Sequence, residues 1–331
     1  MFVEYAETMK ALKTILSILM ILFLVFTPKA LAAAAQTRFV DARFVRKEQA
    51  YRGTITMYHI VRQRPYSGSL SNWLQKRADE YEKKHRGSVI AVEGMDEATF
   101  YERLAHGRRA DAYSFFSGSV YRDLLSDLPE MSVPLREGLK QTDRAIPYCY
   151  SGYARLQRNQ TEANTKQYCA SDVLAAYLDA GENNAEEKNA DELCLDLRRA
   201  GDLIRYVDGF ETAEIKPIDN FTDAVCWIGI DRDTSTEKHA VIESFIEWLL
   251  REESQQKLNA LGLLSVRADV RDNAPESMLK EVFKTYETLV TVDPFRWYAE
   301  FDALSADARL ARSGDAEAKA RFAKRLRDLI T

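Results

Sequence analysis

Apolar and polar positions in the first half of the chain predict a strand, a polar loop and a helix in succession. Ile55–Val61 is a nearly continuous apolar run rich in β-branched residues, which is typical of a strand buried on both faces. Ser71–His85 places Trp73 and Tyr81 on one apolar stripe, and Gly87 supplies a stop signal, so this segment predicts a helix. The polar stretch R-Q-R-P-Y-S-G lies between the two elements.

The same alternation continues with a second strand, a second helix and a third strand. Ser88–Val92 predicts the second strand. Asp96 is a suitable N-cap for a helix that ends at Gly107. Ala110–Phe116 predicts a third strand, which leads into S-G-S. The order is therefore strand, helix, strand, helix, strand.

Such crossovers give parallel strands, so the loops after the three strands emerge at one edge of the sheet. Ligands of open α/β sheets bind outside the carboxyl ends of the strands. We therefore expect the loop Arg62–Leu70, the turn Gly94–Asp96 and the turn Ser117–Ser119 to converge on one site.

The N-terminal segment has the layout of a signal peptide. Ile15–Phe26 is apolar apart from one serine, and an A-x-A cleavage site stands at Ala30–Ala32. As a helix the run would reach about 18 Å, short of a hydrocarbon core of roughly 30 Å. We expect cleavage of residues 1–32 and export to the periplasm or beyond, with Met9 as an alternative start. No cysteine follows the run, so we expect no lipid attachment.

Composition excludes some partners and bounds the size. The chain has 46 Lys and Arg against 51 Asp and Glu, interleaved along the sequence, which disfavours nucleic acid and anionic membranes as partners. The roughly 300 residues after the signal suffice for two lobes. The four cysteines, Cys149, Cys169, Cys194 and Cys226, lack a C-x-x-C spacing, and they fit either free thiols or one disulfide.

Two blocks of sequence resemble bacterial extracellular solute-binding proteins of family 1, the receptors of ABC importers. The first contains G-T-I-T-M-Y-H-I-V, S-N-W-L-Q-K-R-A-D-E-Y and F-Y-E-R-L-A-H-G-R-R-A-D-A-Y-S-F-F-S-G. The second runs from F-T-D-A-V-C-W-I-G-I to K-L-N-A-L-G-L-L-S-V and resembles the return segment of that family, a strand followed by two helices and a final strand.

The resemblance implies a type II periplasmic-binding-protein fold, with two α/β lobes of mixed sheets flanked by helices and joined by hinge strands. The lobes would be 36–147 with 223–266 and, reduced in size, 148–222 with 267–331. Crossings near Ala145–Tyr153 and Asn220–Val225 would place Cys149 and Cys226 close enough for a disulfide. Function would be capture of a small solute, a carbohydrate or polyol by resemblance, and its delivery to an ABC permease by a monomeric receptor without cofactor.

Candidate ligand contacts come from the loop, the strand ends and the first crossing. Sugars need aromatic faces and planar polar groups, whereas anions need arginines or backbone amides. The stretch A-G-D-L-I-R-Y also resembles a family segment at two positions, Asp202 and Arg205. The expected ligand-binding residues are Arg62, Arg64, Tyr66, Ser67, Glu93, Met95, Phe115, Ser117, Tyr148, Tyr150, Asp202 and Arg205.

Several of these residues have equally good structural interpretations. The loop can be ordinary solvated surface, and Tyr148 and Tyr150 can pack between hinge strands. Trp297 and Tyr298 fit either a cleft wall or a lobe core. A ferric-ion or anion receptor of the same fold and a ligand-presenting partner of a membrane sensor kinase are alternative functions. With no G-x-S-x-G, H-E-x-x-H or P-loop spacing, we expect neither an enzyme nor a metal site.

Overall fold

A computed structural model supplies the structure of this protein. The residues that it describes are 51–62, 68–158, 168–169, 191–196, 214–217, 220–273 and 280–330. The expected signal peptide, most of the polar loop and the segment containing Asp202 and Arg205 lie outside these residues.

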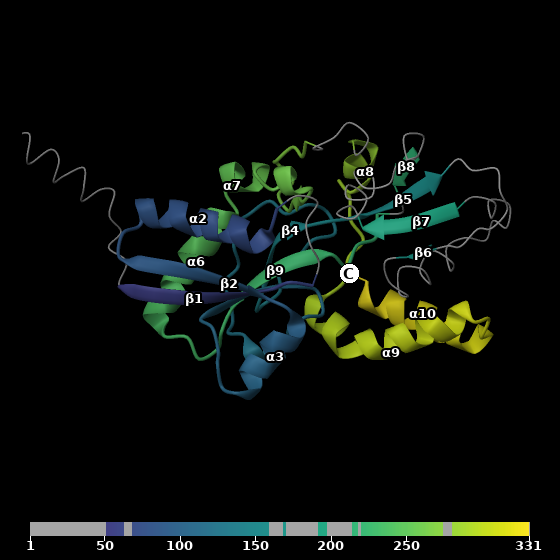
Figure 1. Ribbon diagram of the computed structural model, residues 1–331, viewed down its shortest axis with the longest axis horizontal. Helices are drawn as coiled ribbons and strands as arrows, with labels where there is room; N and C mark the ends of the chain where they lie inside the picture. Colours follow the sequence, from purple (N-terminus) through teal and green to yellow (C-terminus); the bar gives the residue numbers. More distant parts are fainter. Residues whose placement is uncertain are drawn as a thin grey trace, which may run out of the picture. The chain divides into compact units, whose positions relative to one another are not determined.

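A six-stranded mixed sheet organises the larger part of the described chain (Figure 1). The strand order is β10-β4-β9-β3-β1-β2. β1 pairs in parallel with both β2 and β3, whereas β9 runs antiparallel to β3 and β4. The strands are β1 (Gly53–Ile60), β2 (Ser88–Met95), β3 (Ala112–Phe116), β4 (Ile146–Tyr150), β9 (Val225–Ile230) and β10 (Leu264–Ser265).

The first strands and helices form where the sequence predicts them. α2 (Leu70–Lys84) begins after Ser69, whose side chain accepts a hydrogen bond from the Asn72 amide. α3 (Glu97–Ala105) begins after Asp96, which accepts the Thr99 amide at 2.8 Å. The predicted turn at Gly94–Asp96 is wrong in one respect, because β2 continues to Met95, which is paired with Ile60.

α2 and α3 cover opposite faces of the sheet (Figure 1). On one face, Trp73 of α2 stacks on Tyr148 of β4, with ring centroids 6.3 Å apart. On the other, Phe100 of α3 packs against Tyr113 of β3, at 5.6 Å. The Tyr148 hydroxyl contacts Ser114, the residue after Tyr113, as expected when successive side chains of a strand point to opposite faces.

The return segment also matches its prediction of a strand, two helices and a final strand. After β9 come α6 (Thr236–Leu249) and α7 (Glu252–Gln256), then β10. Within the described residues, the remaining elements are a second sheet of order β6-β7-β5-β8, three further helices and two short 3₁₀ turns. They are β5 (Tyr153–Arg158), β6 (Tyr168–Cys169), β7 (Asp191–Asp196), β8 (Glu214–Pro217), α8 (Lys280–Thr285), α9 (Pro294–Arg312), α10 (Ala316–Leu329), η1 (Arg122–Leu124) and η2 (Asn259–Leu261).

The chain passes between the two sheets along hydrogen-bonded neighbouring segments. The Ser151 amide, just after β4, donates to the Ala224 carbonyl, just before β9, at 2.9 Å. Thr222 donates through its hydroxyl to the Ser151 carbonyl and through its amide to Val290. A third segment, which leads to α9, therefore runs beside the two predicted crossings.

Cys149 and Cys226 are opposite each other on the paired strands β4 and β9. Their expected proximity is confirmed, but the structure does not join them in a disulfide. A register shift between Pro147 and Cys149 places two residues of β4 opposite Cys226. The sulfur of Cys226 lies 3.2 Å from the Tyr148 hydroxyl.

None of the helices in the described part of the chain has the length and apolar content that a bilayer crossing requires.

A chain of polar side chains crosses the α2 face of the sheet inside the core. His59 Nδ1 lies 2.8 Å from Ser114 Oγ, which lies 2.8 Å from the Tyr148 hydroxyl, and this hydroxyl meets Cys226. His59 is 1% exposed, and burial lowers its pKa from 6.5 to about 4. The folded state therefore favours the neutral form of the His59 imidazole.

This burial predicts a loss of stability in mild acid. Between the unfolded pKa of 6.5 and the folded pKa of about 4, the unfolded chain binds the additional proton, so stability falls as pH falls. Urea unfolding of the wild type should lose about 3 kcal/mol from this group between pH 7 and pH 4. His59→Gln should remove that part of the pH dependence, whereas His106→Gln, at an exposed position, should retain it. Equal pH profiles for the wild type and His59→Gln would contradict the prediction.

Candidate functional site

The carboxyl ends of β1, β2 and β3 meet at one edge of the sheet, as the parallel pairing predicts. The described residues that follow these strands are Arg62 after β1, Asp96 after β2 and the turn Ser117–Ser119 after β3. Two of these three segments are in direct contact, because Arg62 donates to the Ser117 carbonyl at 2.7 Å.

The turn Ser117–Gly118–Ser119 is hydrogen-bonded to β9 and to α9. The Ser117 amide donates to Val225 of β9, and the Ser117 hydroxyl accepts the Trp227 indole N–H at 2.9 Å. The Gly118 amide donates to the carbonyl of Pro294, the first residue of α9. The turn therefore fixes β9 and α9 to the end of β3.

Gly118 is required at the centre of this turn for two reasons. Its φ of +84° lies in the left-handed region that residues with a Cβ rarely adopt. A Cβ atom there would also lie 2.7 Å from Cδ1 of Trp297 and 3.2 Å from NH1 of Arg62. The missing side chain thus lets the indole of α9 and the guanidinium of the β1 loop approach the same point of backbone.

The Arg62 guanidinium is held without a carboxylate. Besides the bond to Ser117, its Cζ lies 4.7 Å from the ring centroid of Phe301 in α9, a cation–π contact. No ion pair within the described residues includes Arg62. The positive charge at this edge is therefore not neutralised by a side chain of the described chain.

Three tyrosines from separate elements gather beside the turn. The Tyr101 hydroxyl of α3 donates to the Ser119 carbonyl at 3.0 Å, and Tyr298 of α9 lies near enough to raise the pKa of Tyr101. Tyr121 and Tyr298 have ring centroids 6.2 Å apart, and Tyr298 is 37% exposed. We call Tyr101, Tyr121 and Tyr298 the tyrosine cluster. It presents aromatic surface and phenol groups at the predicted edge.

The surroundings of Tyr101 favour its neutral phenol. Burial raises the pKa of Tyr101 most, with further contributions from Tyr298 and from the nearby charge of Glu97. Two polar atoms of the turn and of α9, Ser119 Oγ and Trp297 Nε1, are buried and without a hydrogen-bond partner among the described residues. A buried donor without a partner costs about 1–3 kcal/mol, so a water or solute oxygen that reached it would be stabilised.

The described members of the predicted ligand set lie in different surroundings. Arg62 and Ser117 are at the edge, as given above. Glu93 is exposed and paired with Arg103 at 2.6 Å, and Met95 is buried. Phe115 is fully buried and packs on Phe295 of α9, with ring centroids 6.3 Å apart. The predicted residues outside the described chain are Arg64, Tyr66, Ser67, Asp202 and Arg205.

Tyr148 and Tyr150 lie in the core and not on an open face. Both are fully buried, and the Tyr150 hydroxyl donates to the Tyr286 carbonyl at 2.7 Å. Burial raises the pKa of both phenols. Their side chains therefore pack between strands and helices in this structure, the alternative that the sequence left open.

Sequence reasoning missed Tyr101 and Tyr121 and left Tyr298 undecided. One signal was available, because Tyr121 follows S-G-S-V directly after the third strand. Tyr101 lies beside Phe100 on the predicted helix and gave no separate signal. Its role depends on contact with a residue almost 200 positions later, Tyr298.

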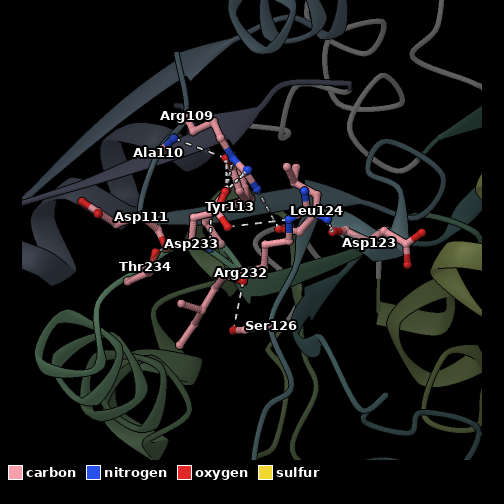
Figure 2. A network of polar contacts seen from close by, with 12 residues as sticks. Arg109, Ala110, Asp111, Tyr113, Asp123, Leu124, Ser126, Arg232, Asp233 and Thr234 are labelled. Atoms are coloured by element: carbon pink, nitrogen blue, oxygen red, sulfur yellow. Dashed lines mark hydrogen bonds and ion pairs between the residues drawn. The ribbon is translucent and has the colours of Figure 1, made fainter. Parts of the chain in front are cut away.

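The opposite end of β3 carries a polar cluster of a different kind, which Figure 2 shows from close by. Arg109 Nε donates to Asp231 at 2.8 Å, and Arg109 also contacts Asp233. The Tyr113 hydroxyl donates to the same Asp231 at 2.6 Å. These groups satisfy one another and fix the turn after β9, so we assign them a structural role.

The described residues contain no group of three or more His, Cys, Asp or Glu side chains placed to hold an ion.

Solved structures show that the fold is that of the two-lobed periplasmic binding proteins. The GacH receptor of Streptomyces glaucescens, solved unliganded and with acarbose, matches with a TM-score of 0.54 at 15% identity, covering 85% of this chain and 100% of that one. The cyclic α-maltosyl-1,6-maltose binding protein of Arthrobacter globiformis matches with a TM-score of 0.60 at 9% identity, covering 83% and 97%.

A ferric binding protein from Campylobacter jejuni also matches, with a TM-score of 0.50 at 12% identity, covering 77% of this chain and 98% of that one. No family model matches the chain, and no curated protein matches its sequence. The predicted fold class, a two-lobed α/β protein with mixed sheets, is therefore confirmed. The division into residue ranges for the two lobes stays a prediction.

Substitution of Gly118 tests whether the turn requires a residue without a side chain. Gly118→Ala should destabilise the protein by about 2–4 kcal/mol, because it adds left-handed backbone strain and overlap with Trp297. Gly107→Ala is the matched control, since Gly107 has a φ of +70° but nothing within 4 Å of its added Cβ. The control should lose about 1–2 kcal/mol from the backbone alone. Urea unfolding measures both, and equal losses would show that the contact with Trp297 contributes nothing.

Proposed function

We propose that this protein is an extracytoplasmic receptor that captures a small carbohydrate or polyol and delivers it to an ABC permease. The observation that carries the proposal is the tyrosine cluster, which lies at the carboxyl edge of the sheet, where α/β sheets bind ligands. The fold is one that solved receptors named for saccharides share.

The chemistry of the tyrosine cluster suits a polyhydroxylated solute. Aromatic faces pack against the C–H surfaces of a sugar ring, and phenol groups both donate and accept hydrogen bonds. The raised pKa of Tyr101 keeps its phenol neutral, and because this phenol donates its proton to the Ser119 carbonyl, its oxygen is left to accept a hydrogen bond from a solute. Ser119 Oγ and Trp297 Nε1 add two polar atoms that need partners.

The alternatives receive less support from the same residues. A ferric-ion site would use phenolates, whereas burial and neighbouring groups raise the pKa of Tyr101 and oppose its ionisation. The proposed pair Tyr148 and Tyr150 lies in the core. A ligand-presenting role beside a membrane kinase would use the same capture step, and a neighbouring permease gene pair or kinase gene distinguishes these outcomes.

The rest of the proposal follows from this role. The protein would act as a monomer, without enzymatic activity or a cofactor, after export directed by residues 1–32. A thermal-shift screen with mono- and oligosaccharides tests it directly, since a ligand at 100 times its dissociation constant adds about 2.7 kcal/mol of stability. Absence of a shift with every saccharide in the panel would reject the carbohydrate assignment.

Tyr298 supplies the test of the site. Tyr298→Ala should weaken binding of a saccharide identified by the screen at least about tenfold, the scale of a lost aromatic contact. Folding stability should change by less than about 0.5 kcal/mol, because the side chain is 37% exposed. Leu310→Ala, at an exposed position of the same helix, should bind as the wild type does. Calorimetry that gives equal affinities for both variants would place the solute elsewhere.

A further inference from the structure

The charge at the sheet edge has no counterpart in the described chain. Arg62 is a cation at this edge, and among the described residues it donates a hydrogen bond to a neutral acceptor, the Ser117 carbonyl, whereas Arg103 nearby is paired with Glu93. Two other described arginines pair with carboxylates, since the partly buried Arg109 meets Asp231 and the buried Arg136 meets Asp272. Arg62 instead contacts the Ser117 carbonyl oxygen and the Phe301 ring. Both contacts orient the guanidinium, and neither partner carries a negative charge that would neutralise it.

Arg62 and the tyrosine cluster are attached to the same short piece of backbone. Arg62 donates to the carbonyl of Ser117, and Tyr101 donates to the carbonyl of Ser119. Two residues of extended chain span at most about 7 Å, so the two anchor points are closer together than the length of a disaccharide. The spacing of the two anchor points is therefore compatible with one solute that meets both the guanidinium and the aromatic surface.

A guanidinium beside aromatic faces recognises a particular kind of solute. The planar N–H groups of arginine bind carboxylates in pairs, and charge-assisted hydrogen bonds are about twice as strong as neutral ones. A neutral sugar would leave the charge of Arg62 without a counter-ion when it displaced water from this edge, which is unfavourable. Glu97, whose charge acts on Tyr101, opposes an anion on the tyrosine side and so directs the negative group toward Arg62.

Building on the proposed function, we infer that the solute is an acidic sugar, with a carboxylate on Arg62 and a ring face on the tyrosine cluster. Galacturonate and galactose are a suitable pair of probes, because they differ only in a carboxylate in place of a hydroxymethyl group. The purified exported chain should bind galacturonate, glucuronate or one of their short oligomers at least about tenfold more tightly than the neutral counterpart. Affinity should fall when the salt concentration rises from 50 to 300 mM, because salt screens the pair.

Variants of Arg62 separate charge recognition from folding. Arg62→Gln should lower affinity for the acidic sugar about tenfold to hundredfold and abolish the preference over the neutral sugar. Arg62→Lys should keep part of the preference, since it retains the charge without the planar pair of donors. Arg108→Gln removes an exposed arginine outside the site and should change neither. Urea unfolding of each variant confirms that the chain is folded before calorimetry.

The outcomes distinguish this inference from the function on which it rests. If neutral sugars bind as tightly as acidic ones, with Tyr298 required and Arg62→Gln without effect, the inference is overturned and the carbohydrate receptor stands. If no acidic sugar of the panel binds, the inference also fails. A preference for the acidic sugar that disappears only in Arg62→Gln supports it.

Discussion

The turn at Gly118 is the constraint on which the rest of this site depends. Its three residues accept or donate hydrogen bonds to Arg62, to Tyr101, to β9 and to α9. A residue with a Cβ would both strain the backbone and overlap the Trp297 indole. The position of an aromatic helix against the sheet edge is therefore set by the absence of one methyl group.

The arginines at the two ends of β3 have different partners. At its amino end, Arg109 is neutralised by Asp231 and Asp233, and the Tyr113 hydroxyl completes the cluster. At its carboxyl end, the described residues offer Arg62 a carbonyl and an aromatic ring in place of a carboxylate. Coupled charges rigidify the first end, while the second keeps a charge that an external group can use. The difference explains why polar residues at one edge are structural and those at the other are candidates for binding.

The pattern of apolar residues was sufficient to predict the helices whose formation depends on residues close together in the sequence. The stripe that contains Trp73 and the N-cap Asp96 fixed α2 and α3, because both depend on neighbours within a few positions. The tyrosine cluster could not be predicted in this way, since Tyr101 and Tyr298 meet only after α9 docks on the end of β3. Tyr148 shows the same limit, because the register shift in β4 that brings it to Cys226 has no local signature.

α9 links the candidate site to the strands that join the two sheets. Trp297, which touches Gly118, also packs in the apolar cluster of the C-terminal helices and lies 6.5 Å from the Phe221 ring by centroids. Phe221 pairs with Val290 where the connecting segments run side by side. Because protein interiors are close-packed, the Trp297 indole fixes the position of α9 relative to both the sheet edge and the connecting segments.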